Sequence, residues 1–148
     1  VKSEVEGLKS KIGGIKRLVD LISENYTMIK TLSDLDVFNL SYKYANEIFI
    51  ITRSFPREEI YSLTDQVIRS SRSIAANIAE GWGKRTYENE FKKHLVYATG
   101  SLEETKVWLL FSKDCKYITT EKFQELFLSS DELGAKIYKL YQTWKTIN

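Results

Sequence analysis

Apolar residues recur every three or four positions along almost the whole chain, which is the spacing of one face of an α-helix. No stretch has the apolar and polar alternation that is typical of a half-buried strand. A single proline, Pro56, interrupts the 148 residues. The pattern therefore predicts an all-α protein, and a chain of this length can bury the core of one main domain without disulfides or metals.

Local signals divide the second part of the chain into four helices. Pro56 ends the first helix, since the residue before a proline avoids the α region, and the acidic residues that follow favour a second helix at once. Gly81 and Gly83 supply a termination signal, and Thr119 is suited to begin the last helix. Connections of about two to eight residues place neighbouring helices antiparallel. We expect an up-down-up-down antiparallel four-helix bundle, with helices over about 36–52, 57–81, 86–113 and 119–144.

The first 30 residues carry a heptad pattern of their own, so we divide the chain into an N-terminal coiled-coil-like helix, 1–30, and the bundle, 31–148. Branched residues at both core positions of the heptads favour three or more strands. The seam can pack back on its own bundle as a fifth helix, or pair with other chains. The candidate oligomerisation residues are Val5, Leu8, Ile12, Ile15, Val19 and Ile22.

Net charge gives little indication of a partner, because it is only +2 at neutral pH. Residues 55–115 hold nine Lys and Arg against nine Asp and Glu. A symmetric assembly could still gather a modest basic patch into a larger one. No apolar run reaches the roughly 18 residues that span a bilayer, so we expect no membrane partner. The single cysteine fits a reducing compartment, and we expect the protein in the cytoplasm.

Basic residues flank the predicted turn between the second and third bundle helices. They could neutralise phosphates, while Trp82 or Tyr87 stacks on an unpaired base. The alternative is a solvated face with salt bridges to Glu88 and Glu90. The candidate nucleic-acid-binding residues are Arg69, Arg72, Lys84, Arg85, Lys92 and Lys93.

Polar residues also line one side of the second bundle helix, where they could face His94 and others on the third. Buried polar groups need hydrogen-bond partners, so we expect a structural network that fixes helix register and a sharp turn at Gly81. Its predicted members are Ser73, Asn77, Glu80, Ser101 and Glu104.

Catalytic patterns are missing from the sequence. A di-metal bundle needs paired Glu-x-x-His motifs, and His94 is the single histidine. One His and one Cys supply no supported nucleophile and base, and no glycine-rich phosphate loop follows a strand. We expect no catalytic residues, no metal, no cofactor and no enzymatic activity.

Three motifs in this order are distinctive: Phe55-Pro56-Arg57-Glu58-Glu59-Ile60-Tyr61-Ser62-Leu63, Ser73-Ile74-Ala75-Ala76-Asn77-Ile78-Ala79-Glu80-Gly81-Trp82-Gly83, and Ala98-Thr99-Gly100-Ser101-Leu102-Glu103-Glu104. Over about residues 32–147 the chain resembles the four-helix-bundle family encoded in intervening sequences of bacterial large-subunit (23S) ribosomal RNA genes. The first 28 residues lie outside that pattern.

The resemblance implies an up-down-up-down bundle that forms a homo-oligomer, with a pentamer favoured. A related branch serves as the accessory protein of diversity-generating retroelements, where a basic pentamer engages a reverse transcriptase and nucleic acid. Our leading hypothesis is a non-catalytic oligomeric scaffold that binds RNA or an RNA-handling protein. The alternatives are a protein-binding adaptor that uses the N-terminal coiled coil, and the reverse-transcriptase accessory subunit.

Overall fold

The computed structural model describes residues 1–27 and 29–146, and the side chains of residues 1–18 and 29–146. This described part is helical and contains no strand. The chain divides into two compact units, residues 1–35 and 36–148. The helices are α1 (Lys2–Thr27), α2 (Asp36–Thr52), α3 (Leu63–Gly83), α4 (Glu88–Asp114) and α5 (Thr120–Thr143), with short 3-10 turns η1 (Leu32–Asp34) and η2 (Arg57–Glu59).

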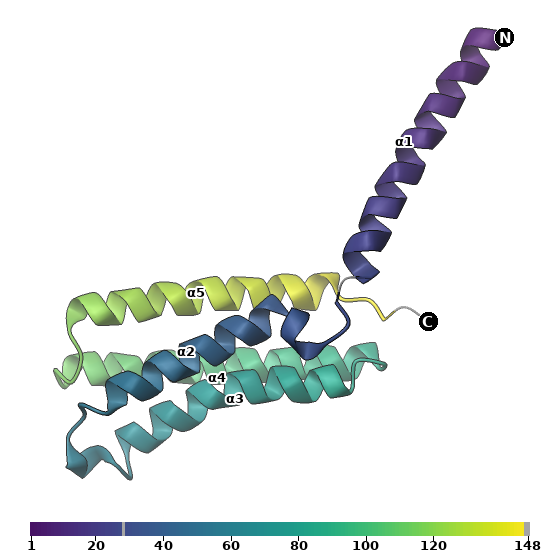
Figure 1. Ribbon diagram of the computed structural model, residues 1–148. Coiled ribbons are helices and arrows are strands. Elements are labelled where there is room, and N and C mark those ends of the chain that lie inside the picture. Colours follow the sequence, from purple (N-terminus) through teal and green to yellow (C-terminus); the bar gives the residue numbers. More distant parts are fainter. Residues whose placement is uncertain (28, 147–148) are drawn as a thin grey trace. The chain divides into compact units, whose positions relative to one another are not determined.

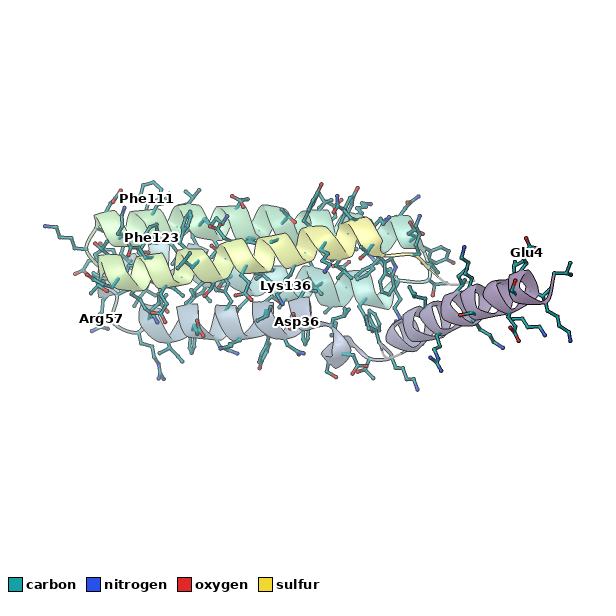
Figure 2. The ribbon with its side chains drawn as sticks, turned by 90° about the horizontal axis from the view of Figure 1, so that it is seen from above. Glu4, Asp36, Arg57, Phe111, Phe123 and Lys136 are labelled. Carbon is teal, nitrogen blue, oxygen red and sulfur yellow. The ribbon has the colours of Figure 1, made fainter. Side chains whose placement is uncertain are left out.

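The second unit is an antiparallel bundle, as the sequence predicts. Successive helices from α2 to α5 reverse direction, so that the chain runs up, down, up and down (Figure 1). All four helices bury their apolar faces toward one another, and Ile48, Ile74, Leu102 and Ile137 have no more than 1% of their surface exposed. At the rim, Lys136 of α5 pairs with Asp36 of α2 at 2.6 Å (Figure 2).

The connection between α2 and α3 differs from the prediction that a helix follows Pro56 at once. Residues Arg57–Glu59 form the 3-10 turn η2 instead, and α3 begins only at Leu63. The Glu59 carboxylate accepts hydrogen bonds from the Ser62 hydroxyl, the Leu63 backbone N–H at 3.0 Å and the Tyr117 hydroxyl at 3.1 Å. Glu59 therefore satisfies the first turn of α3 and ties it to the loop before α5.

The prediction of a sharp turn at Gly81 is wrong. Gly81 lies inside α3, which continues to Gly83, and no described glycine has a positive φ. A Cβ atom at position 81 would lie 2.7 Å from His94 Cβ and 2.9 Å from a ring carbon of Phe91. Glycine is needed here because α4 approaches the backbone of α3 too closely for any side chain.

The first unit contains α1, a helix of 26 residues with a sequence-predicted seam. Among the seam residues, Val5 is 46% exposed, Leu8 and Ile12 are each 59% exposed, and Ile15 is 64% exposed. Val19 and Ile22 lie outside the described side chains. The described part of the seam is thus an apolar stripe in contact with solvent.

We predict that Gly81→Ala destabilises the protein, whereas Gly100→Ala does not. The added methyl at position 81 forces α3 and α4 apart, which typically costs about 1–3 kcal/mol. A Cβ at Gly100 on α4 meets nothing within 4 Å, so alanine there should stabilise the helix by about 0.5–1 kcal/mol. Urea unfolding followed by circular dichroism measures both effects, and equal stabilities would contradict the close-approach explanation.

We also predict that Glu59 makes stability depend on pH. The Ser62 hydroxyl, the Leu63 N–H and the Tyr117 hydroxyl lower the pKa of Glu59 below its ordinary value of 4.5. A lowered folded-state pKa adds stability above the unfolded-state value, and this stability is lost as pH falls through the folded-state value. Glu59→Gln should therefore lower the melting temperature at neutral pH, and the difference should disappear in acid.

Glu58→Gln provides the matched control for this substitution, because Glu58 is an exposed neighbour in the same turn. Thermal melts of both variants at a series of pH values make the comparison. A melting temperature of Glu59→Gln that stays below that of the parent protein throughout the acid range would show that shape, not charge, matters at this position.

Candidate functional site

The six basic residues chosen from the sequence separate into two groups. Lys84 and Arg85 follow the end of α3, and Lys92 and Lys93 begin the facing part of α4, so these four lie at the α3–α4 turn. The other pair, Arg69 and Arg72, lies further back on α3. The two groups have different surroundings.

At the α3–α4 turn, carboxylates already offset two of the positive charges. Lys84 Nζ lies 2.9 Å from Glu80 Oε1, and Lys92 Nζ lies 2.9 Å from Glu88 Oε1. These contacts lower the pKa of Glu80 and of Glu88, chiefly through the lysine hydrogen bonds. The predicted alternative of salt bridges to Glu88 and Glu90 thus describes Lys92, whereas Lys84 pairs with Glu80 instead.

Arg85 folds back on the protein. Its guanidinium carbon lies 4.1 Å from the ring centroid of Trp82, and Nη1 donates to the Trp82 carbonyl at 2.9 Å. Trp82 is only 7% exposed and packs edge-on against Phe91 and Trp144. The prediction that Trp82 could stack on a base is therefore wrong. The other aromatic residue named for that role, Tyr87, is 71% exposed.

The second group gains two residues that the sequence did not single out. The guanidinium carbons of Arg72 on α3 and of Arg53 just after α2 lie 5.0 and 5.8 Å from the ring centroid of Phe49. Arg69 lies one turn before Arg72 on α3, and its Nη1 atom lies 3.8 Å from Asp65 Oδ2. The Phe49 side chain is 38% exposed, and Arg53 four residues later was the sequence signal for this contact.

The predicted polar network crosses the interface between α3 and α4. Ser101 Oγ donates to Ser73 Oγ at 3.0 Å, and the Asn77 amide donates to the Ser73 carbonyl at 2.9 Å. Asn77 also contacts His94, at 3.4 Å from Oδ1 to Nδ1. Glu104 lies apart from this hydrogen-bond network, and its carboxylate accepts a hydrogen bond from the Trp108 indole N–H at 3.2 Å.

His94 occupies the end of this network and is 5% exposed. Lys84 Nζ lies 3.0 Å from His94 Nε2 and can only donate, so Nε2 accepts. The ring proton is then on Nδ1, where it can be donated to Asn77 Oδ1. This tautomer agrees with the orientation of the Asn77 side-chain amide, whose oxygen faces His94 while its nitrogen faces Ser73. The single histidine of the chain thus has both nitrogens engaged in structural contacts.

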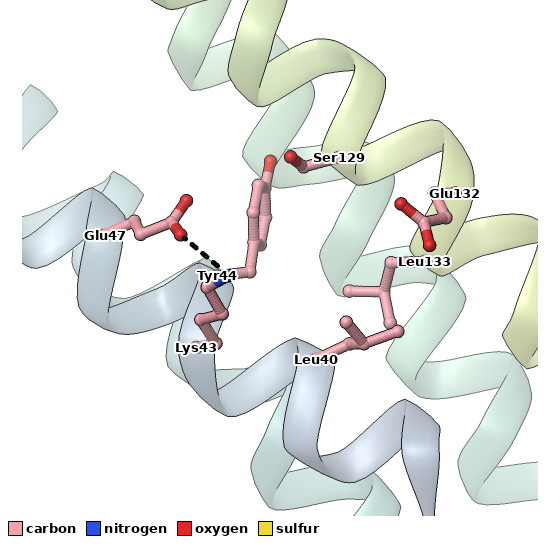
Figure 3. A pocket seen from close by; sticks show the side chains of 7 residues that line it. All are labelled: Leu40, Lys43, Tyr44, Glu47, Ser129, Glu132 and Leu133. Atoms are coloured by element: carbon pink, nitrogen blue, oxygen red, sulfur yellow. Dashed lines mark ion pairs between the residues drawn. The ribbon is translucent and has the colours of Figure 1, made fainter.

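A small hollow between α2 and α5 contains the most buried phenol in the bundle (Figure 3). Tyr44 is 3% exposed, and its hydroxyl makes no hydrogen bond of ordinary geometry, although Ser130 is near. Burial is the main cause that raises the pKa of Tyr44. The hollow has a volume of about 100 Å³ and is lined by polar Lys43, Glu47 and Glu132. These features favour hydration beside a buried ring over a ligand site.

Among the described residues, no three His, Cys, Asp or Glu side chains come close enough to hold a metal ion. No helix of this part of the chain is both long and apolar enough to cross a membrane.

Comparisons with known proteins identify the bundle. No curated protein matches the chain. A crystal structure of a protein of unknown function from the S23 ribosomal protein family of Bacteroides thetaiotaomicron matches with a TM-score of 0.66 and 26% identity, over 72% of this chain and 96% of that one. The family model of the 23S rRNA-intervening sequence protein matches residues 33–139. The chain therefore belongs to the 23S rRNA-intervening sequence protein family.

Proposed function

We propose that this protein is a non-catalytic scaffold that self-assembles through α1 and binds RNA. The observation that carries the proposal is the exposed apolar stripe of α1. Four described heptad residues, Val5, Leu8, Ile12 and Ile15, are each about half exposed or more. Burying apolar surface contributes roughly 25 cal/mol per Å², so a second copy of the same helix is a favourable partner.

The seam also supports an assembly larger than a dimer. Ile12 and Ile15 occupy the a and d positions of one heptad, and branched residues at both positions favour three or more strands. The resemblance noted above favours a pentamer. A closed symmetric ring of five subunits would bring five copies of each basic patch to one assembly.

Exposed apolar side chains on the bundle give this assembly a second contact surface. Between α4 and α5, a hollow of about 200 Å³ is lined by apolar side chains, among them Val96, Tyr138 and Tyr141. These three are 54%, 61% and 39% exposed. Phe111 extends the apolar surface toward the other end of α4 and is 52% exposed (Figure 2). Apolar patches of this kind are typical of interaction surfaces.

RNA is the proposed ligand because the family name associates these proteins with intervening sequences of 23S rRNA. Net charge gives weak support, since it is only +2. Binding would therefore depend on the local arrangement of Arg69, Arg72 and their neighbours rather than on overall charge.

A protein-binding adaptor without nucleic acid is the second candidate. The pairing of Lys84 with Glu80 and of Lys92 with Glu88 favours it, because paired lysines attract phosphates less. In that case the α1 seam would match a coiled coil of another protein. The two functions differ in their dependence on salt.

We predict that two acidic substitutions in the seam, Ile12→Glu and Ile15→Glu together, lower the mass of the particle in solution. Charges facing one another in a coiled-coil core are desolvated and repel, so the helices should separate. Multi-angle light scattering of the full chain measures the mass. Ser3→Glu with Ser10→Glu is the matched control, since both serines lie opposite the seam, and a monomeric parent protein would refute the scaffold.

We further predict that the full chain retains single-stranded RNA and that this retention weakens steeply as salt rises. Each contacted phosphate should contribute about 0.7 to the slope of log affinity against log salt. Replacing Arg69, Arg72, Lys84 and Arg85 together by alanine should abolish retention, as measured by filter binding. Unchanged retention by this variant would favour the adaptor instead.

A further inference from the structure

Two arginines share one aromatic ring on the outer face of α2 and α3. Arg53 and Arg72 come from different elements, yet both guanidinium carbons lie within 6 Å of the Phe49 ring centroid, at 5.8 and 5.0 Å. A cation over a ring gains electrostatic attraction, which holds an otherwise flexible side chain in place. Phe49 therefore holds two positive groups close to each other at the surface.

Neither guanidinium has a carboxylate partner among the described residues. Within that part of the chain, Arg69 is the arginine that forms an ion pair, with Asp65, and the remaining pairs involve lysine or His94. Two like charges without a counter-ion make a local positive potential that a single anion can relieve. Guanidinium groups suit phosphate oxygens, because their planar donors match the anion in two parallel hydrogen bonds.

A hollow between α2 and α3 adjoins one of the two arginines, Arg72. It has a volume of about 300 Å³, and Arg72 forms one wall. Its floor is Ala45 and Ala75, which are 7% and 8% exposed, so the space exists because two small residues face each other. The side of the hollow is formed by Asn46 and by Tyr42, whose ring is 60% exposed. We call Tyr42, Asn46, Phe49, Arg53 and Arg72 the α2–α3 groove.

We propose that the α2–α3 groove binds one unpaired nucleotide of a single-stranded RNA, an inference that rests on the proposed RNA-binding function. Arg53 and Arg72 bind the phosphate, and the base enters the hollow and stacks on Tyr42. The side-chain amide of Asn46 has both donors and an acceptor for the edge of the base. Stacking on an aromatic ring together with phosphate contacts is the common way that proteins bind single strands.

The shape of the groove favours a nucleotide over other anionic ligands. A phosphorylated peptide would use the arginines alone and leave the exposed Tyr42 ring and the hollow without a role. An RNA duplex keeps its bases stacked and paired, so no base could enter the hollow.

The test uses the full chain and a fluorescein-labelled single-stranded oligouridylate, with anisotropy recorded over a range of salt concentrations. Arg53→Ala with Arg72→Ala should reduce the slope of log affinity against log salt by about 0.7, because the two arginines together contact one phosphate. Tyr42→Leu should weaken binding about tenfold with an unchanged slope, because it removes stacking and no charge.

Matched controls come from exposed residues outside the groove. Arg57→Ala with Lys139→Ala removes two charges, and Tyr61→Leu removes a ring that is 96% exposed. Both controls should bind as the parent protein does. Circular dichroism melts would show that all variants keep the fold, which we expect because the substituted side chains lie at the surface.

The outcomes separate this inference from the function on which it rests. If the parent protein binds no RNA at any salt concentration, the proposed function fails, and the groove fails with it. If the parent binds and the groove variants bind equally well, the groove is wrong while RNA binding stands. Equal affinity of the parent for a duplex, or loss of binding in the arginine variant with no effect of Tyr42→Leu, would overturn the nucleotide assignment.

Discussion

The close approach of α3 and α4 at Gly81 is the constraint on which the rest of the bundle depends. With no side chain at this position, the Phe91 ring and the His94 Cβ atom lie directly against the α3 backbone. Farther along the interface, small hydroxyl residues take the place of large apolar ones, and Thr105 donates to Ser70 at 2.9 Å. An interface of this kind fixes the register of the two helices, because each hydroxyl has a partner only when the helices are aligned in one way.

This arrangement has consequences for the surface. Hydrogen-bonding side chains occupy the side of α3 that faces α4, whereas Arg72 meets Phe49 on the side that faces α2. At the α3–α4 turn, Lys84 donates a hydrogen bond to His94 of the same interface. One lysine that could have met a phosphate thus has a structural role, while Arg72 keeps its guanidinium available to solvent.

The sequence predicts the helices well because their signals are local. Pro56 and Thr119 act through their own backbone and side-chain chemistry, and Thr119 accepts the expected hydrogen bond from the Lys122 N–H at 3.1 Å. Gly81 was misinterpreted because its role depends on α4, which no local pattern reveals. The exposure of Phe49 was also hard to predict, because Phe49 adjoins Ile48, which is fully buried, and adjacent helical residues differ by about a quarter of a turn.

The same reasoning explains why charge counts were a poor guide to a candidate site. Nine basic and nine acidic residues between positions 55 and 115 cancel in the sum. The structure nevertheless pairs Lys84 and Lys92 with acids, and it leaves Arg72 on the Phe49 ring beside Arg53, which lies just before the counted segment. A phosphate responds to the charges within about one Debye length, which is roughly 8 Å at physiological salt. Within that distance, two arginines without acidic partners matter more to a phosphate than the net charge of the whole bundle. A nearly neutral bundle can therefore still hold an anion at one place on its surface.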